Sequence, residues 1–177
     1  MATECEGNPI PYPVSVTVRT DLQQAIGGYR HDLPHSGDME MYLRFAAHAS
    51  VGFIDAEQGW YRRHSSNMSH GYLNVADFRQ KLAAFEAAFD TCRDLIREHA
   101  ALMIAARRSV LTAVLWAAHH AFDRGRAQDV DDLLAFAVSV DPSVRRWRLW
   151  RRLQIKRLIG GRIVRYAESI RRLAVGK

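Results

Sequence analysis

The spacing of apolar residues along the chain changes near residue 75. Before that point, apolar and polar residues alternate in one short run, VSVTVR at residues 14–19. Alternation with a period of two is typical of a strand that buries one face, so this run is predicted to be a β-strand. VGFIDA at residues 51–56 is predicted to be a second strand, and the start of GWYRRHSSNMS at residues 59–69 the end of a third. Beyond residue 75, apolar residues recur three and four positions apart, which is the period of helices packed on one side.

Two short helices are predicted among these strands. The first is Thr20–Ile26, with Thr20 as its expected N-cap and the Gly27-Gly28 pair as its stop. The second is Asp38–Ala49, an apolar helix that opens with two acidic residues. The pattern therefore predicts a mixed α/β region over residues 1–71, in which Trp60 lies in the core or in a pocket wall.

The remainder, residues 72–177, is predicted to be an all-helical extension. Helices are expected from about Val75, over residues 109–125 and over residues 127–140, followed by two basic helices broken at Gly160-Gly161. The first of them presents an apolar seam made of Phe78, Leu82, Phe85, Phe89, Cys92 and Ile96.

Charge changes this picture at the C-terminal end. The formal net charge is +6, but residues 143–177 hold twelve Arg or Lys and a single acid, Glu168, so residues 1–142 carry about −5. The basic helices are predicted either to pack on the preceding helices with their arginines in water, or to lie on an anionic membrane surface beside Trp147 and Trp150. Nucleic acid is the less favoured partner for the same helices.

The cysteines and the lengths of the apolar runs indicate where in the cell the protein is expected. Cys5 and Cys92 are far apart, and no Cys/His cluster suggests a disulfide framework or a zinc site. No signal peptide is visible, and the longest apolar runs, such as residues 100–106, are too short to span a bilayer. We expect a cytoplasmic protein, at most peripheral at the inner face of the membrane.

Three stretches carry a family resemblance when they are taken in order. They are PVSVTVRTDLQQAIGGYR, LPHSGDMEMYLRFAAHASVGFI and WYRRHSSNMS, within residues 10–70. Together they resemble the second, acceptor-side half of the catalytic domain of family 2 glycosyltransferases, the inverting GT-A type. The resemblance implies transfer of a sugar from a nucleotide-sugar donor to a hydroxyl of a carbohydrate or lipid-linked acceptor, as in the synthesis of cell-envelope polysaccharides.

The resemblance also implies a role for the acids that open the second helix. Asp38 matches the family's general base, which takes the proton of the attacking acceptor hydroxyl. Gly37 stands at the acceptor site where the family has a glutamate, and Glu40 would hold a nearby donor or the acceptor. The alternative from the residues alone is that Asp38 simply caps its helix.

The third stretch would supply the donor side. His64 matches a family histidine that ligates a divalent metal, manganese or magnesium, or contacts the donor diphosphate. Arg62 and Arg63 would offset charge on the departing diphosphate. The alternative is an ordinary surface histidine.

The family's nucleotide-binding half, which ends in a DxD metal motif, would precede residue 1. The only local DxD, at residues 129–131, falls inside a predicted helix and fits a solvated face. We therefore expect a truncated or partial enzyme with doubtful activity by itself. The second hypothesis is a non-catalytic helical interaction or membrane-surface module that carries a relic of the glycosyltransferase fold.

Overall fold

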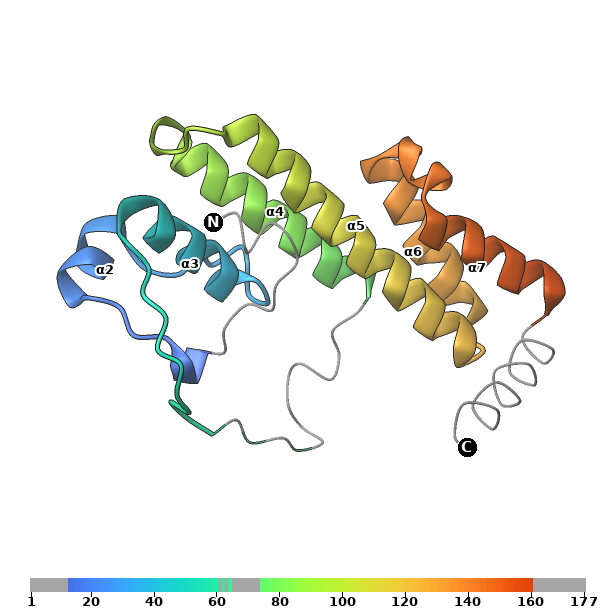
Figure 1. Cartoon of the computed structure of the whole chain (residues 1–177), viewed down its shortest axis with the longest axis horizontal. Coiled ribbons are helices and arrows are strands. Elements are labelled where there is room, and N and C mark those ends of the chain that lie inside the picture. The colour runs from blue at the N-terminus through green and yellow to red at the C-terminus, as the bar shows by residue number, and fades with distance from the viewer. Residues whose placement is uncertain (1–12, 61, 63, 65–73, 161–177) are drawn as a thin grey trace. The chain divides into compact units, whose positions relative to one another are not determined.

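The computed structural model describes residues 13–60, 62, 64 and 74–160 (Figure 1). Within these residues every regular element is a helix, and none of them is a strand. The predicted α/β fold class, with a partial GT-A-like sheet, is therefore wrong.

The first two predicted strands have no strand structure, and most of the third, predicted at the start of residues 59–69, lies outside the described residues. The first becomes a short 3-10 helix, η1 (Pro13–Ser15), and a connection to helix α2 (Thr20–Ile26). The second, residues 51–56, has no regular structure. Trp60, which follows it, is 90% exposed and does not lie in the core or in a pocket wall, as was predicted. A strand needs a neighbouring strand to satisfy its backbone N–H and C=O groups, and the described residues supply no such neighbour.

The ends of α2 follow only part of the expected capping. Thr20 is the first helical residue, and Arg19 occupies the N-cap position without a side-chain hydrogen bond, so the predicted Thr20 cap is wrong. Gly27 stops the helix as expected, with φ of 87°. This left-handed conformation is accessible to glycine because glycine lacks a Cβ.

Helices α3 (Gly37–His48) and α4 (Val75–Thr91) pack against each other and form the core of the N-terminal part. Both were predicted, and α3 begins one residue earlier than expected. α4 opens with a capping box, in which Asn74 and Asp77 each accept a hydrogen bond from the other's backbone N–H. The buried apolar side chains are Leu33, Met39, Met41, Leu43, Phe45, Phe78, Phe85, Phe89, Cys92 and Ile96.

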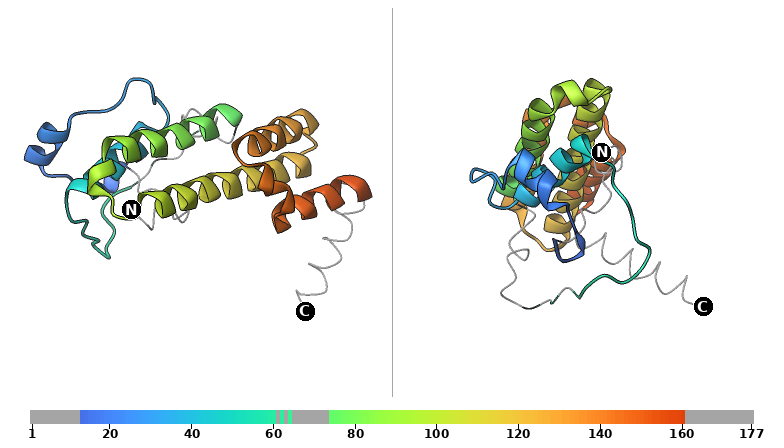
Figure 2. Two further views of the ribbon diagram at one scale, coloured as in Figure 1. Left: turned by 90° about the horizontal axis from the view of Figure 1, so that it is seen from above. Right: turned by 90° about the vertical axis from the view of Figure 1, so that its left-hand side faces the viewer.

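A 3-10 turn, η3 (Arg93–Leu95), leads into the longest helix, α5 (His99–Asp123). α5 begins ten residues before the predicted start at Ser109. Its first half runs beside α4, as the contacts of Arg107 with Glu86 and of His99 with Phe89 indicate (Figure 2). Among the described residues, α5 is the one helix long and apolar enough to cross a membrane, and 33% of its most apolar window is buried in the protein. Core helices of soluble proteins have the same length and composition, so this is weak evidence for a membrane span.

The chain divides into two compact units, Met1–Val110 and Leu111–Lys177. The division falls inside α5. The boundary predicted between residues 71 and 72 lies at a stretch, residues 65–73, that is outside the described residues.

The C-terminal unit contains the second half of α5, then α6 (Ala127–Val140), the 3-10 helix η4 (Pro142–Arg146) and α7 (Arg148–Ile159). α6 was predicted. α7 is the first of the two basic helices, and it ends at Gly160, with φ of 84°, where the sequence predicts a break. The second basic helix would fall in residues 161–177, outside the described residues. The most deeply buried side chains are Leu111, Val114, Leu115, Val130, Val144 and Leu153.

Candidate functional site

Asp38, the predicted general base, lies in the first turn of α3 between two tyrosines. The N-cap of α3 is Ser36, so Asp38 does not occupy the cap position and instead adds negative charge near the positive end of the helix dipole. Burial, together with a hydrogen bond to Asp38 and its charge, raises the pKa of Tyr29. Burial and the charge of Asp38 raise the pKa of Tyr42 to about 12. At neutral pH both phenols are therefore protonated beside this carboxylate.

Gly37 begins α3 and packs against one of these tyrosines. A Cβ at this position would lie 3.4 Å from Cδ1 of Tyr29, which is ordinary van der Waals contact. Gly37 therefore lies next to the side chain of Tyr29, beside the cluster formed by Tyr29, Asp38 and Tyr42.

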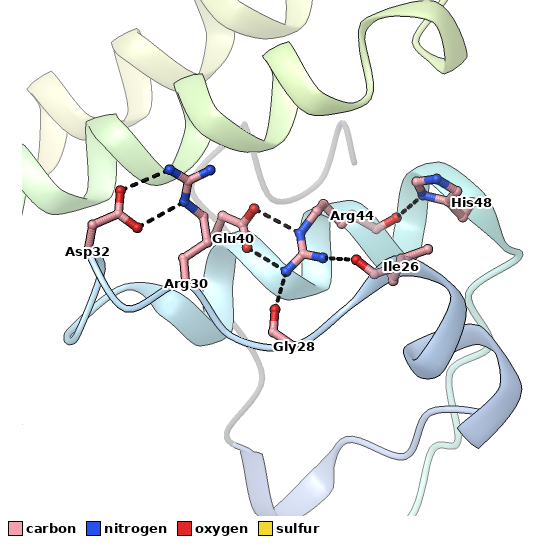
Figure 3. A network of polar contacts seen from close by, with 7 residues as sticks. All are labelled: Ile26, Gly28, Arg30, Asp32, Glu40, Arg44 and His48. Carbon is pink, nitrogen blue, oxygen red and sulfur yellow. Dashed lines mark hydrogen bonds and ion pairs between the residues drawn. The ribbon is translucent and has the colours of Figure 1, made fainter.

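Glu40, two residues further on, belongs to a separate and buried arrangement (Figure 3). Its two carboxylate oxygens accept hydrogen bonds from Nε and Nη2 of Arg44 at 2.8 and 2.9 Å. The two residues are 1% and 5% exposed. Such a two-pronged contact between guanidinium and carboxylate is strong and has a fixed geometry.

Arg44 also joins α3 to the end of α2. Its Nη1 donates to the carbonyl of Ile26 at 2.6 Å, and its Nη2 donates to the carbonyl of Gly28 at 2.8 Å (Figure 3). The carbonyl of Ile26 belongs to the C-terminal end of α2, where no intrahelical donor is available, and that of Gly28 belongs to the loop that follows. The ion pair of Glu40 and Arg44 therefore holds the end of α2 against α3. The predicted contact of Glu40 with an acceptor stays a prediction.

The predicted donor-side residues follow the irregular segment after α3. Arg62 and His64 are exposed, and Arg63 lies outside the described residues. In the part of the chain that the structure describes, no group of three or more His, Cys, Asp or Glu side chains could hold a metal ion. The described residues thus do not assemble a divalent-metal site around His64, and the metal stays a prediction.

Reasoning from sequence overlooked Tyr29, Tyr42 and Arg44. Two of the three carried a signal, because Tyr42 follows Asp38 by four positions and Arg44 follows Glu40 by four. Side chains four residues apart lie on the same face of a helix and can interact. Tyr29 had no such signal, since its contact with Asp38 depends on how the loop after α2 folds back.

A second candidate site lies on α7, which exposes one continuous face that we call the basic-apolar face. Its positions recur at intervals of three and four residues and so share one side of the helix. The first half of this face is basic and the second half is apolar. It consists of Arg148, Arg151, Arg152, Ile155, Leu158 and Ile159, all exposed.

The opposite side of α7 holds the helix to the rest of its unit. Leu153 is fully buried. Lys156 Nζ lies 3.3 Å from a carboxylate oxygen of Asp123, and Arg157 Nη2 lies 2.7 Å from one of Asp131. Two of the cations of α7 are therefore used within the protein, while no ion pair joins a described carboxylate to the three arginines of the basic-apolar face.

The start of α7 is held from α5. Nε2 of His119 lies 3.0 Å from the carbonyl of Leu149, and His119 is 5% exposed. A carbonyl only accepts hydrogen bonds, so Nε2 carries the proton. Burial lowers the pKa of His119, an effect that this hydrogen bond partly opposes. The ring of Trp116 lies 5.8 Å from that of His119 and is half exposed beside it.

Comparisons with models of protein families, with curated proteins and with solved structures found no match. Because the described residues also contain no strand, the resemblance to family 2 glycosyltransferases is wrong. The first two of its three stretches have local explanations, and most of the third lies outside the described residues. Gly27 stops a helix, and Asp38, Glu40 and Arg44 make contacts within the first unit. Short motifs of this kind arise from helix ends and helix faces, so their order along the chain did not identify a family.

Proposed function

We propose that this protein binds anionic membrane surfaces through the basic-apolar face of α7. The observation that supports the proposal is the arrangement of that face, in which three exposed arginines are followed by three exposed aliphatic side chains on one side of one helix. Interfacial helices combine cationic side chains, which contact anionic headgroups, with apolar side chains, which enter the headgroup–acyl boundary.

The apolar half of the face has no evident role inside its own unit. Leu158 is 87% exposed and Ile155 is 54% exposed, whereas Leu153 on the other side is fully buried. Exposed aliphatic groups next to each other are costly in water and gain free energy on entering the boundary between headgroups and acyl chains. Burying them there leaves α7 attached to its unit through Leu153.

The basic half supplies the preference for anionic lipid. A cation near an anionic bilayer contributes about 1 kcal/mol, so Arg148, Arg151 and Arg152 together contribute roughly 3 kcal/mol. The aliphatic stems of arginine allow the guanidinium groups to reach phosphates while the helix lies lower in the interface. In sequence, residues 161–177 add five further cations and one acid, which strengthens the same preference.

Not every cation of α7 is expected to bind lipid, and the proposal does not depend on an enzymatic activity. Lys156 and Arg157 are already paired with Asp123 and Asp131, so they are expected to contribute stability more than lipid affinity. Sugar transfer from a nucleotide-sugar, expected from the sequence, stays a prediction that no described contact supports. The membrane-surface function is therefore proposed in its own right, independent of any enzyme ancestry.

The test is co-sedimentation of the full chain with vesicles. Phosphatidylserine-containing vesicles are expected to retain the protein, and pure phosphatidylcholine vesicles are not. Replacing Arg148, Arg151 and Arg152 together by glutamine is expected to reduce binding at least tenfold, because about 3 kcal/mol of attraction is removed. Raising the salt concentration should weaken binding by the wild type in the same direction.

The matched control removes three exposed arginines elsewhere, Arg79, Arg97 and Arg124, again by glutamine. This variant has the same net charge as the first and is expected to keep most of the binding. Equal loss in both variants would mean that only overall charge matters, and the proposal would fail. Binding to duplex DNA in place of vesicles would also overturn it.

A further inference from the structure

The three arginines of the basic-apolar face form a cationic cluster that we call the arginine triad. Arg148 precedes Arg151 by three residues and Arg152 by four, so its side chain neighbours both of them on one side of α7. α7 itself contains no acidic residue, and no described carboxylate forms an ion pair with the triad. Like charges at this spacing repel each other, and an anion bound between them relieves the repulsion.

The remaining cations of α7 are arranged differently. Lys156 and Arg157 each contact a carboxylate of their own unit, Asp123 and Asp131, at 3.3 and 2.7 Å. The helix therefore neutralises the cations near its C-terminal end from within the protein. The cations of its first turn and a half are left for an anion from outside.

All three members of the triad are arginine, although lysine would supply the same charge. A guanidinium presents parallel N–H groups that bind two phosphate oxygens at once, whereas an ammonium acts as a point charge. A phosphodiester has two free oxygens and a single negative charge, which one guanidinium occupies. A phosphomonoester has three free oxygens and a charge of about −1.5 to −2 at pH 7, so it can accept such contacts from two or three arginines.

We propose that the arginine triad recognises a phosphomonoester headgroup of a membrane lipid, of the type present in phosphatidic acid. This specificity rests on the membrane-surface function proposed above. The apolar half of the same face favours a lipid over a free phosphate as the ligand. Ile155, Leu158 and Ile159 are exposed directly beyond the triad, where they can enter the acyl region while the arginines hold the headgroup.

The first test compares two anionic lipids by co-sedimentation of the full chain. Vesicles contain either phosphatidic acid or phosphatidylglycerol, a phosphodiester, and are matched for surface charge by their electrophoretic mobility. The protein should bind phosphatidic acid about fivefold more tightly, which is the order of magnitude of one additional hydrogen bond. Equal binding to both lipids would overturn the specificity and leave the membrane-surface function standing. Binding to neither would overturn both.

The second test separates the guanidinium groups from their charge. Replacing Arg148, Arg151 and Arg152 together by lysine preserves the net charge and the helix propensity but removes the parallel N–H groups. Binding to phosphatidylglycerol should be nearly unchanged, and the preference for phosphatidic acid should disappear.

The matched control replaces three exposed arginines elsewhere, Arg79, Arg97 and Arg124, by lysine. This variant should keep the full preference for phosphatidic acid. A preference that persists in the triad variant, or that is lost equally in both variants, would overturn the assignment to the triad.

The third test separates a lipid headgroup from a free phosphate. Protein bound to phosphatidic acid vesicles is exposed to millimolar inorganic phosphate, or to sodium chloride of equal ionic strength. Phosphate should release no more protein than chloride does, because it offers nothing to the apolar half of the face. Greater release by phosphate would mean that the triad binds the free anion, and the lipid assignment would fall.

Discussion

Glu40 and Arg44 form a buried ion pair one helical turn apart on α3, and the same guanidinium closes the end of α2 through the carbonyls of Ile26 and Gly28. A buried charge is costly unless its partner and its hydrogen bonds are complete. Here the carboxylate has both oxygens occupied, and the guanidinium makes two further contacts with backbone oxygens. The short α2, which has no buried residue of its own, depends on these contacts for its position.

Replacing Arg44 by methionine should therefore destabilise the protein strongly. The change leaves the carboxylate of Glu40 buried without a partner, and it removes the donors that satisfy two carbonyls. Loss of one member of a buried pair costs about 3–5 kcal/mol. Urea unfolding of the full chain measures the free energy.

The matched control is the double variant Glu40→Gln with Arg44→Met, in which no buried charge remains. It should recover part of the loss. Arg44→Lys should be intermediate, because lysine cannot make the two-pronged contact. A cost below about 1 kcal/mol for Arg44→Met would contradict a buried, fully paired arrangement.

The tyrosines beside Asp38 should make stability fall at high pH. The pKa of Tyr42 is raised from 10.0 to about 12, so the unfolded chain loses this proton first. The stabilising contribution is complete below pH 10 and is lost as the pH rises towards 12. The urea midpoint of the wild type should fall between pH 10 and pH 12. The urea midpoint of Tyr42→Phe should fall less steeply over the same range.

Removing the carboxylate of Asp38 tests whether its negative charge raises the pKa values of Tyr29 and Tyr42. In Asp38→Asn, the negative charge next to both phenols is lost, so the tyrosinate forms become easier to reach. Ultraviolet titration at the tyrosinate band should show both pKa values shifted downwards relative to the wild type. An unchanged titration curve would mean that burial alone raises them.

Stability should also decline on acidification, through His119. Burial lowers its pKa below 6.5, with Arg152 and Lys156 acting in the same direction and Asp123 opposing them. The unfolded chain therefore takes up a proton before the folded one. The contribution is present above pH 6.5 and is lost as the pH falls through the folded value. The melting temperature should fall between pH 7.5 and pH 5.

His119→Gln should reduce this pH dependence, while His120→Gln, at the exposed neighbouring position, should keep it. The first variant is also expected to lower stability at neutral pH by about 1 kcal/mol, if glutamine fails to reach the carbonyl of Leu149. If the melting temperature of His119→Gln falls with pH as steeply as that of the wild type, a group other than His119 causes the decline.

The capping box of α4 predicts a smaller and local effect. Asn74 accepts a hydrogen bond from the N–H of Asp77 at 3.1 Å, and the carboxylate of Asp77 also lies 3.3 Å from Nδ1 of His35. Asn74→Ala should cost about 1 kcal/mol, whereas Asn74→Asp should be nearly neutral because aspartate caps equally well. Chemical denaturation distinguishes the two. Equal stability in both variants would mean that the cap is not needed.

The sequence by itself determined most of the helices. The bounds of α2, α3 and α6 agree with those predicted to within a residue or two, and α7 ends where the glycine pair at Gly160 predicts a break. These elements are readable because a helix closes its hydrogen bonds within four residues, and its stops are set by local residues such as glycine. The early start of α5 at His99 was missed because Ser109 resembled a helix beginning.

Only the tertiary structure decided what became of VSVTVR and VGFIDA. A strand closes its hydrogen bonds with residues far away in the sequence, so a strand-like sequence shows that a segment could pair without showing that a partner exists. The contact of Asp38 with Tyr29 likewise depended on how the preceding loop folds back onto α3. The spacing of Glu40 and Arg44 allows their ion pair from sequence, but only packing decided that this pair is buried.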